Sequence, residues 1–448
     1  MKKVLLMLAF FATMFFVSCN ENGIGGNTPK PTTPEEHKKR LEEISLALID
    51  EVAATNFEEI QDLATYLCVE YSEDNYDYED LEEWAEECYD ALSRTFISES
   101  SESDEWSNWT YRYYNTIVKF SNYTGKFEAK NGKWKYTEAK DLSFHVTDDK
   151  GNPCVLRLTT SGDTKKAYFG EEWSYTGSYY DENDKYNYGY DIDNIYVYVP
   201  EKITVSLEQN KKTLAKANVK IDLSSMSGEE FNLTNDKYNV TGEFEFNGYS
   251  VELEKCKYAP EKGSAVAANF KKGSKSLVKA SVSADLDVSN DNFYGSTNNA
   301  VSIDVMGEIQ IKGTITGDIT EMAKELDKAY DNETNEKVFK EAIEKVNNLF
   351  DVKLYYNNSK TASATFKLMV FLDDRSYNNL YWDCELAIVF DDGTSYSVEE
   401  FFNEKDFKNV IKAFERLIED YIDLVDEIED EVYEDMNNDD GYDDEYYY

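Results

Sequence analysis

Histidine is almost absent from this sequence, and its scarcity narrows the chemistry that the chain can perform. The 448 residues contain two histidines, His37 and His145. Proton transfer in active sites and zinc coordination use histidine more often than other side chains. His37 falls in the first turn of an expected helix, beside Lys38 and Lys39, where we expect it to be exposed to solvent. The composition therefore favours a non-enzymatic protein without a metal ion or other cofactor.

The second histidine lies close to a cysteine, so a Cys–His nucleophile pair has to be weighed. His145 precedes Cys154 across an expected hairpin, in which residues 149–151 (Asp-Lys-Gly) form a three-residue loop with glycine in the left-handed position. That loop places Val146 opposite Cys154 and His145 opposite Val155. Because successive residues of a strand point to opposite faces, the imidazole and the thiol lie on different faces. A buried structural thiol is the favoured interpretation.

A regular cysteine pattern is also missing. Six cysteines are present, and their spacing contains no CxxC pair, so it indicates neither a zinc site nor a disulfide framework. We expect buried structural thiols, with one bridge between Cys68 and Cys88 as an open alternative. The sequence also lacks a GxSxG motif, a P-loop and a GxGxxG motif after an expected strand.

Basic residues are too few to balance the acidic ones. There are 46 lysines and arginines against 90 aspartates and glutamates, which gives a formal net charge of −44. Such a charge repels nucleic acid, so we expect no nucleic-acid partner. No basic residue follows Arg416, and we expect residues 433–448 to form a disordered acidic tail. A pair of carboxylates for glycoside hydrolysis could be drawn from so many acids, but the sequence singles out no pair.

Long apolar runs are missing apart from one near the start. The stretch from Val4 to Val17 has 14 residues, fewer than the roughly 20 that a membrane-spanning helix needs. Lys2 and Lys3 precede it, and Ser18-Cys19 follows it. This start resembles the Bacteroidetes-type lipoproteins that signal peptidase II processes. The resemblance implies a signal peptide over residues 1–18, acylation of Cys19 and attachment to the cell envelope as an outer-membrane lipoprotein, on the periplasmic face or the cell surface.

Composition and periodicity divide the remainder of the chain. After the lipidated cysteine, residues 19–34 form a flexible tether rich in Gly and Pro. Helical periodicity marks residues 35–97, starting at Thr33-Pro34, where a capping residue precedes a proline at the first helical position. Residues 98–432 alternate between polar and apolar as strands do. Helices interrupt that β-rich region at 319–350 and 404–432.

The alternating region predicts an antiparallel sheet with definable turns. Asn-Gly pairs at 131–132 and 247–248 indicate two-residue hairpins. We expect residues 98–104 (SESSESD) to be a solvated loop and residues 301–315 to be one long strand. The predicted fold class is α+β, a large, mainly antiparallel β-sheet with the N-terminal and C-terminal helices packed on it.

The last expected helix carries apolar rows at seven-residue spacing. One row contains Phe407, Phe414 and Tyr421, and β-branched residues form another. A third row with Val410 and Leu417 widens the apolar stripe, which suits packing on a globular core better than a two-stranded coiled coil. We therefore expect a monomer, and a dimerising coiled coil is the alternative.

Tyrosine is in excess, with 35 in the chain, and it is densest between residues 173 and 198. Exposed aromatic faces between acids suit sugar rings, which offer apolar C–H faces and hydroxyls. The favoured interpretation, however, is that tyrosine simply fits half-buried strands and loops, and sugar contact is the alternative. The aromatic residues between 106 and 114 carry the same ambiguity. The candidate ligand-binding residues are Trp173, Tyr175, Tyr179 and Tyr180.

The expected architecture is similar to that of half-open β-sheet lipoproteins and of the lipoprotein-carrier family, in which helices close a concave sheet over an apolar ligand. This resemblance implies, as the first hypothesis, a non-enzymatic, lipid-anchored envelope protein that binds an apolar ligand between sheet and helices. A surface lipoprotein that binds glycans through exposed aromatic residues is the alternative hypothesis. A glycosidase is the third.

Overall fold

The computed structural model describes residues 31–72, 75–103, 107–180, 186–225, 230–232, 236–259, 263–287, 295–373, 381–403 and 405–437. Backbone contacts divide the chain into two compact units. Unit 1 contains the chain up to Asp62 together with Glu245–Asn437, and the described part of unit 2 lies within Leu63–Phe244. The predicted β-rich region is therefore shared between two units.

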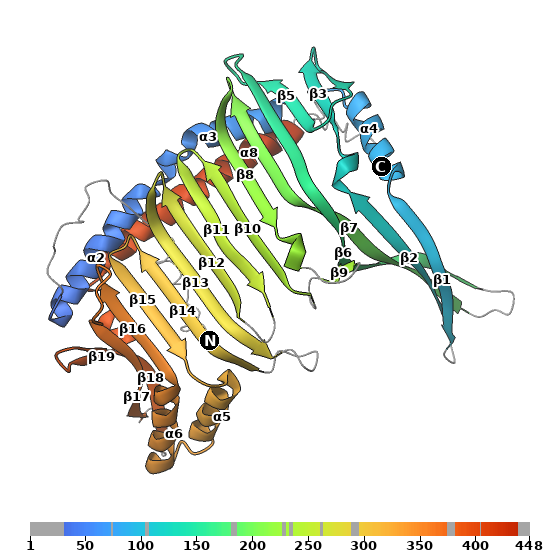
Figure 1. Ribbon diagram of the computed structural model, residues 1–448. Coiled ribbons are helices and arrows are strands. Elements are labelled where there is room, and N and C mark those ends of the chain that lie inside the picture. The colour runs from blue at the N-terminus through green and yellow to red at the C-terminus, as the bar shows by residue number, and fades with distance from the viewer. Residues whose placement is uncertain are drawn as a thin grey trace, which may run out of the picture. The chain divides into compact units, whose positions relative to one another are not determined.

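Unit 1 is built on an antiparallel sheet in which each strand from β11 to β19 pairs with the next along the chain (Figure 1). The predicted turn at 247–248 is confirmed, because Asn247 and Gly248 take the positive φ values of 44° and 80° that a two-residue hairpin requires. The strands are β11 (Tyr249–Tyr258), β12 (Ser264–Lys272), β13 (Lys275–Asp287), β14 (Gly295–Val305), β15 (Ile309–Ile315), β16 (Phe350–Tyr356), β17 (Ala364–Asp373), β18 (Tyr381–Phe390) and β19 (Ser395–Ser397).

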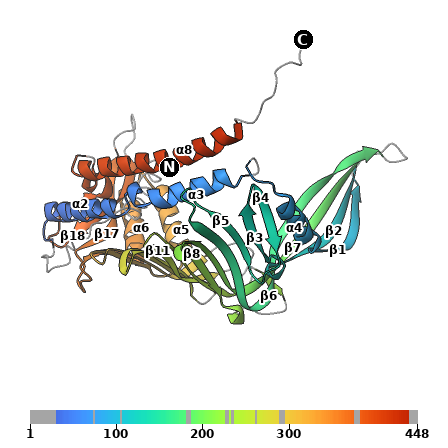
Figure 2. The same cartoon turned by 90° about the horizontal axis from the view of Figure 1, so that it is seen from above.

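The first and last described helices of unit 1 lie side by side, as Figure 2 shows. They are α2 (Pro34–Glu51) and α8 (Lys408–Asn437), and the Asn409 side-chain amide donates to Glu42 across them at 2.8 Å. The predicted start of α2 is confirmed, since the side chain of Thr33 accepts from the backbone N–H of Glu36.

These helices, with the short α7 (Val398–Phe401), bury their apolar stripes on one face of the sheet. Each fully buried Leu, Ile or Phe stabilises the fold by about 1.5–3 kcal/mol. The resulting core includes Leu41, Ile44 and Leu48 of α2, Phe401 of α7, Phe407 and Val410 at α8, and Val305, Ile309, Leu354, Tyr356, Phe366, Ile388 and Phe390 of the strands.

Two further helices, α5 (Ile319–Tyr330) and α6 (Glu336–Leu349), pack on the same face. Phe339 and Ile343 are buried against Leu368 and Val370 of β17. Leu368 stands two residues from Phe366, which faces α2, and alternate residues of a strand share a face. Helices α2, α5, α6, α7 and α8 therefore pack on the same side of the unit 1 sheet.

Unit 2 is also mainly antiparallel, with parallel pairs β2–β7, β3–β5 and β6–β9. Its strands are β1 (Ser93–Ser103), β2 (Ser107–Lys119), β3 (Gly125–Lys130), β4 (Lys133–Thr137), β5 (Leu142–Thr147), β6 (Pro153–Tyr180), β7 (Tyr186–Gln209), β8 (Lys212–Ile221) and β9 (Glu230–Asn232). The division between the units falls within α3 (Glu58–Glu70) and β10 (Tyr238–Phe246).

Helix α4 (Glu79–Asp90) packs beside the β3–β4 hairpin of unit 2. Phe127 and Trp134 are buried there, and the indole N–H of Trp84 donates to the Thr124 carbonyl at 3.0 Å. The predicted turn at 131–132 is confirmed by the hairpin register. The α+β class is also confirmed, with a mainly antiparallel sheet and with the first and last helices packed on a sheet face.

Three predicted elements differ from the structure. Residues 98–103 are not a loop but part of β1, because backbone pairing with β2 stabilises even this polar sequence; the helices before it end at Asp90. The expected strand over 301–315 is split by a turn at Met306-Gly307, where both φ values are positive. Helix α8 continues to Asn437, beyond the predicted 432, and the rest of the acidic tail lies outside the described residues.

The expectation that His37 is exposed is wrong. Its side chain is 1% exposed, because the first turn of α2 lies directly on the sheet. The imidazole Nδ1 lies 3.0 Å from the hydroxyl of Tyr356, and its ring packs 4.6 Å from that of Phe390. A buried imidazole needs such a polar partner, so His37 is a core residue.

Candidate functional site

One end of the unit 2 sheet carries an aromatic face. Four strands form it in the order β1, β2, β7, β6, and in both views their ends extend beyond α4 (Figures 1 and 2). The parallel register of β2 and β7 sets Trp109 beside Tyr188 and Tyr111 beside Tyr190. Tyr175 of β6 faces Tyr190 from the other side. Cross-strand partners share a face, so these side chains lie on the same side of the sheet.

Four of the rings form a nearly parallel stack. The Trp109 ring lies 4.4 Å from that of Tyr188 and 5.8 Å from that of Tyr190, with interplanar angles of 18° and 20°. The Tyr111 and Tyr190 rings are 6.1 Å apart at 19°. Because stacked rings cover one another's faces, these four are half-buried and serve mainly as support.

Trp173 lies across that stack. Strands β2 and β6 flank β7 and are therefore about 10 Å apart, yet the Trp173 ring is only 6.1 Å from that of Tyr111, at 75°. The indole thus reaches over β7, where its cross-strand partner Ile192 is 1% exposed. Trp173 itself is 56% exposed and Tyr175 is 53% exposed. These two rings offer free aromatic surface beside the stack.

Polar groups border the aromatic face on its β1 side. The register places Ser100 opposite Tyr111 and Glu102 opposite Trp109. Burial, followed by the negative charge of Glu102, raises the pKa of Tyr111, so the phenol remains a hydrogen-bond donor at neutral pH. Hydroxyls and a carboxylate beside exposed rings are suited to a ligand that has both apolar faces and hydroxyl groups.

The opposite face of the same four strands is charged. Arg94 donates to Asp193 at 2.9 Å and to Asp191 at 3.2 Å, and Arg112 lies 2.9 Å from Asp191. The hydrogen bonds to Asp193 contribute most to raising the pKa of Arg94. The guanidinium also lies 3.8 Å from the centre of the Tyr114 ring. Strand alternation thus places the stacked rings on one face and the Arg–Asp ion pairs on the other.

The predicted ligand residues fall on this site to different extents. Trp173, Tyr175 and Tyr180 are all more than half exposed, and Tyr180 joins the array through a ring contact of 5.0 Å with Tyr186. Tyr179 pairs with Asn187 through its backbone, and its side chain lies outside the described residues. Cys19 and Trp106 also lie outside them.

Sequence reasoning missed the supporting stack of Trp109, Tyr111, Tyr188 and Tyr190 as a unit. The aromatic residues of β2 and β7 were visible, but they are about 80 residues apart in sequence. Only the parallel pairing of β2 with β7 brings them together. The pairing of an antiparallel hairpin can be predicted from the sequence of its turn, whereas no short stretch of sequence indicates which strands pair in parallel.

The Cys–His pair is not assembled. Val146 faces Cys154 and His145 faces Val155, as predicted. Burial raises the pKa of the Cys154 thiol and lowers that of His145, so neither group is activated. The five cysteines in the described part of the chain are free, which leaves no bridge between Cys68 and Cys88. Cys88 and Cys154 are buried as expected, whereas Cys68 is exposed. Within the same part, no three His, Cys, Asp or Glu side chains are placed to hold one metal ion.

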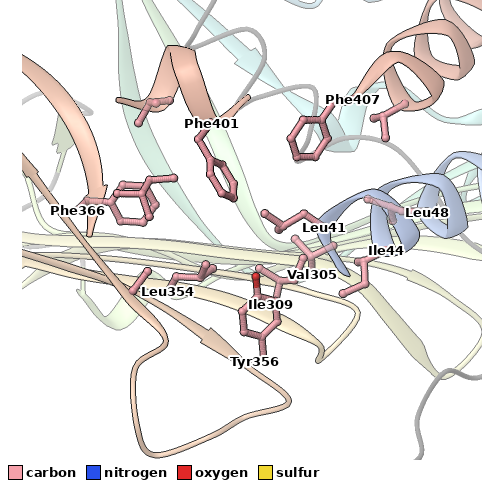
Figure 3. Packing of buried hydrophobic residues seen from close by; sticks show 14 of the residues in the cluster. Leu41, Ile44, Leu48, Val305, Ile309, Leu354, Tyr356, Phe366, Phe401 and Phe407 are labelled. Carbon is pink, nitrogen blue, oxygen red and sulfur yellow. The ribbon is translucent and has the colours of Figure 1, made fainter. Parts of the chain in front are cut away.

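An apolar cavity does lie between helices and sheet in unit 1, where an apolar ligand was expected. Leu41 and Ile44 of α2 and Phe401 of α7 face Ile309 and Leu354 of the sheet across it (Figure 3). Its volume is about 40 Å³, whereas a cavity that takes up benzene measures about 150 Å³. In this conformation the space is too small for an acyl chain.

The helix-facing side of the unit 1 sheet is incompletely covered. Val251, Val266 and Val282 are 41%, 50% and 57% exposed. Val251 faces Phe270 of β12, which packs on the core. Val266 lies four residues before Phe270 on the same strand and faces Val282 of β13. Strand alternation therefore places all three valines on the core-facing side of the sheet. This open strip is the second candidate surface.

Comparisons with protein-family models, with curated proteins and with solved structures each found no match to this chain. In the part of the chain that the structure describes, each helix is too short or too polar to cross a membrane.

Proposed function

We propose that this chain is a lipid-anchored glycan-binding protein of the cell envelope, and that the aromatic face of β2, β6 and β7 is its binding site. The observation that supports it most directly is the exposure of Trp173 and Tyr175 above a fixed stack of further rings. A rigid, pre-formed aromatic surface loses little conformational entropy when a ligand binds. The apolar-ligand hypothesis ranks second, because the cavity between helices and sheet is small.

The net charge of the chain determines which class of glycan we expect it to bind. A chain with a formal net charge of −44 repels anionic polysaccharides. Neutral sugars bind instead by placing apolar C–H faces on aromatic rings while their hydroxyls reach groups such as Ser100 and Glu102. This mode has little long-range electrostatic attraction, so binding changes little with salt concentration.

The test is retention of the purified chain, from Thr28 onward, during electrophoresis in gels that contain starch, laminarin, xylan or mannan. We expect retardation by at least one of these polysaccharides and none by dextran sulfate. Trp173→Ala combined with Tyr175→Ala should abolish it while costing only about 1 kcal/mol of stability, since both side chains are largely exposed. Tyr89→Ala is the matched control, because Tyr89 is 72% exposed on α4 of the same unit and not on any of the four strands that form the aromatic face.

Two results would contradict the proposal. One is migration of the wild-type chain that is the same in all four neutral gels as in a plain gel. The other is retardation that survives the double substitution. Loss of the folded state in the double variant, seen by circular dichroism, would show that the two rings hold the sheet together rather than bind a ligand.

The lipid anchor is supported by the sequence of residues 1–19, which ends in Ser18-Cys19. Cys19→Ala removes the thiol that would be acylated, and two or more acyl chains hold a protein on a membrane almost irreversibly. We expect the variant to leave the membrane fraction or to persist as an uncleaved precursor. Unchanged size and membrane partition on a blot of fractionated cells would argue against an anchor.

The second candidate function is binding of an apolar ligand on the open strip of unit 1. The exposed side chains of Val251, Val266 and Val282 favour it. Apolar patches that stay open to solvent commonly mark a binding surface. This function does not involve the aromatic face, so the two candidates can be tested independently.

A further inference from the structure

We propose that the aromatic face binds an extended glycan chain of several sugar units along β6, and that a β-bulge at Thr176 builds this row of subsites. The inference rests on the proposed glycan binding and adds the shape of the ligand. Three exposed rings, Trp173, Tyr175 and Tyr180, follow one another on β6. Strand alternation alone does not bring all three to the same face.

Regular alternation would separate them. Trp173 and Tyr175 are two residues apart and share a face, but Tyr180 is five residues beyond Tyr175 and would point to the other side. The strand register shows why Tyr180 nevertheless lies on the face of Tyr175. Tyr175 pairs with Tyr190, Gly177 pairs with Gly189, and Ser178 pairs with Tyr188, so Thr176 is an extra residue without its own partner position on β7.

The bulge therefore shifts the alternation by one residue. After it, Ser178 and Tyr180 face the same side as Tyr188 and Tyr186, their partners on β7. Bulges commonly re-aim a side chain in this way. The backbone there also depends on glycine, because Gly177 has a φ of 123°, and a Cβ on Gly189 would overlap the Thr176 hydroxyl.

Ring contacts make the row continuous after the bulge. The Tyr175 ring lies 6.4 Å from that of Tyr188, Tyr188 lies 4.8 Å from Tyr186, and Tyr186 lies 5.0 Å from Tyr180. The hydroxyl of Tyr186 donates to the Ser178 hydroxyl at 2.7 Å, which fixes the ring between the two exposed tyrosines. Tyr180 is the most exposed member of the row, at 68%.

The row has the length and the access that a chain ligand needs. From Trp173 to Tyr180 it extends about 20 Å at the usual rise of a strand, which is longer than a single sugar ring. In the described pairings, residues 171–180 of β6 bond to β7 alone, and the exposure of Trp173, Tyr175 and Tyr180 leaves their rings accessible along the row. Each further ring that a chain reaches adds contact without a second cost of association.

The experiment uses oligosaccharides of increasing length, prepared from whichever of the four polysaccharides retards the chain, in isothermal titration calorimetry. We expect affinity to rise with length until the oligomer covers the row. Tyr180→Ala should weaken binding of long oligomers about tenfold, the loss of one ring contact, and leave binding of the disaccharide unchanged. Trp173→Ala should weaken both. Phe169→Ala is the control, because Phe169 is 56% exposed on the same strand outside the row.

The outcomes separate the two proposals. If affinity does not depend on length, or if Tyr180→Ala affects long and short oligomers equally, the extended row is overturned and a single sugar site remains. If Trp173→Ala changes the affinity for neither the long nor the short oligomers, the proposal that this face binds glycans is wrong. Weakening by Phe169→Ala equal to that by Tyr180→Ala would also overturn the row, because the effect would then not be specific to it.

Discussion

The two units of this protein differ in what covers one face of their mainly antiparallel sheets and in the side chains on that face. In unit 1, helices α2, α7 and α8 cover the face except at the open strip, and the side chains beneath them are mainly aliphatic or phenylalanine with almost no exposure. In unit 2, the ends of β2, β6 and β7 carry Trp and Tyr on a face that leaves Trp173 and Tyr175 more than half exposed. Both surfaces are apolar, but Trp and Tyr, whose side chains have polar tips, make up most of the second and are a minority in the first.

This difference in residue type determines whether each face can be stable in contact with solvent. Aliphatic side chains gain stability only when another element covers them. Tyr and Trp can cover one another through stacking while their hydroxyl and indole N–H groups remain hydrated. A sheet face that has no helix over it can therefore be stable if it is aromatic, and the same property makes it available to a ligand.

The largest effect is expected where α8 meets the core of unit 1. Leu417 is 5% exposed and packs near Val52, whereas the next residue, Ile418, is 42% exposed. Leu417→Asp places a charge in an apolar contact and should cost about 3–5 kcal/mol of unfolding free energy, measured in urea. Ile418→Asp is the control and should cost under about 1 kcal/mol.

The same two substitutions, Leu417→Asp and Ile418→Asp, distinguish a core helix from a dimerising coiled coil. If Ile418→Asp converts a dimer into a folded monomer in light scattering, the β-branched row is an interface and the expectation of a monomer is wrong. If Leu417→Asp leaves stability unchanged, α8 does not seal the core of unit 1.

The next effect concerns an ion pair where α2 ends. Glu51 is buried, and it lies 2.8 Å from Lys272 and 3.0 Å from Lys275. Burial alone would raise its pKa, but the hydrogen bonds and charges of the two lysines outweigh burial and hold the pKa below the usual value. Glu51→Gln should cost about 2 kcal/mol at pH 7.

The pH dependence has a definite sign. A carboxyl group whose folded pKa lies below its unfolded value stabilises the fold above the unfolded pKa, near 4.5, and that contribution is lost as pH falls through the folded pKa. The difference between wild type and Glu51→Gln should therefore be constant from pH 7 to about pH 5 and shrink below about pH 4.5. A difference that stays constant down to about pH 3 would show that the ion pair contributes nothing to stability.

The smallest effect on stability is expected at the open strip of unit 1. Val266→Lys with Val282→Lys should change stability by less than about 1 kcal/mol, because both residues are half exposed. If the strip binds an apolar ligand, the double variant should lose the fluorescence increase that a fluorescent fatty acid shows with the wild type. Ser281→Lys, on the opposite face beside Val282, is the control. Uptake that survives the double variant, or is absent from the wild type, rules the strip out.

Much of the local structure could be predicted because its causes are local. The cap at Thr33, the turns at 131–132 and 247–248 and the hairpin that separates His145 from Cys154 each depend on a few neighbouring residues. The errors have the opposite character. His37 looked exposed because its neighbours are lysines, and residues 98–103 looked like a loop because they are polar, yet packing on a sheet in one case and pairing with β2 in the other decided the outcome.

The sequence by itself determined the α+β class, the acidic charge, the order of the helices and strands and the excess of aromatic residues around Trp173, since composition and periodicity act over short distances. Only the tertiary structure decided which residues form the candidate site. The parallel pairing of β2 with β7 stacks Trp109 on Tyr188, and the bulge at Thr176 turns Tyr180 to the face of Trp173. Both depend on strand register, which contacts between residues far apart in the chain establish and which no short stretch of sequence encodes.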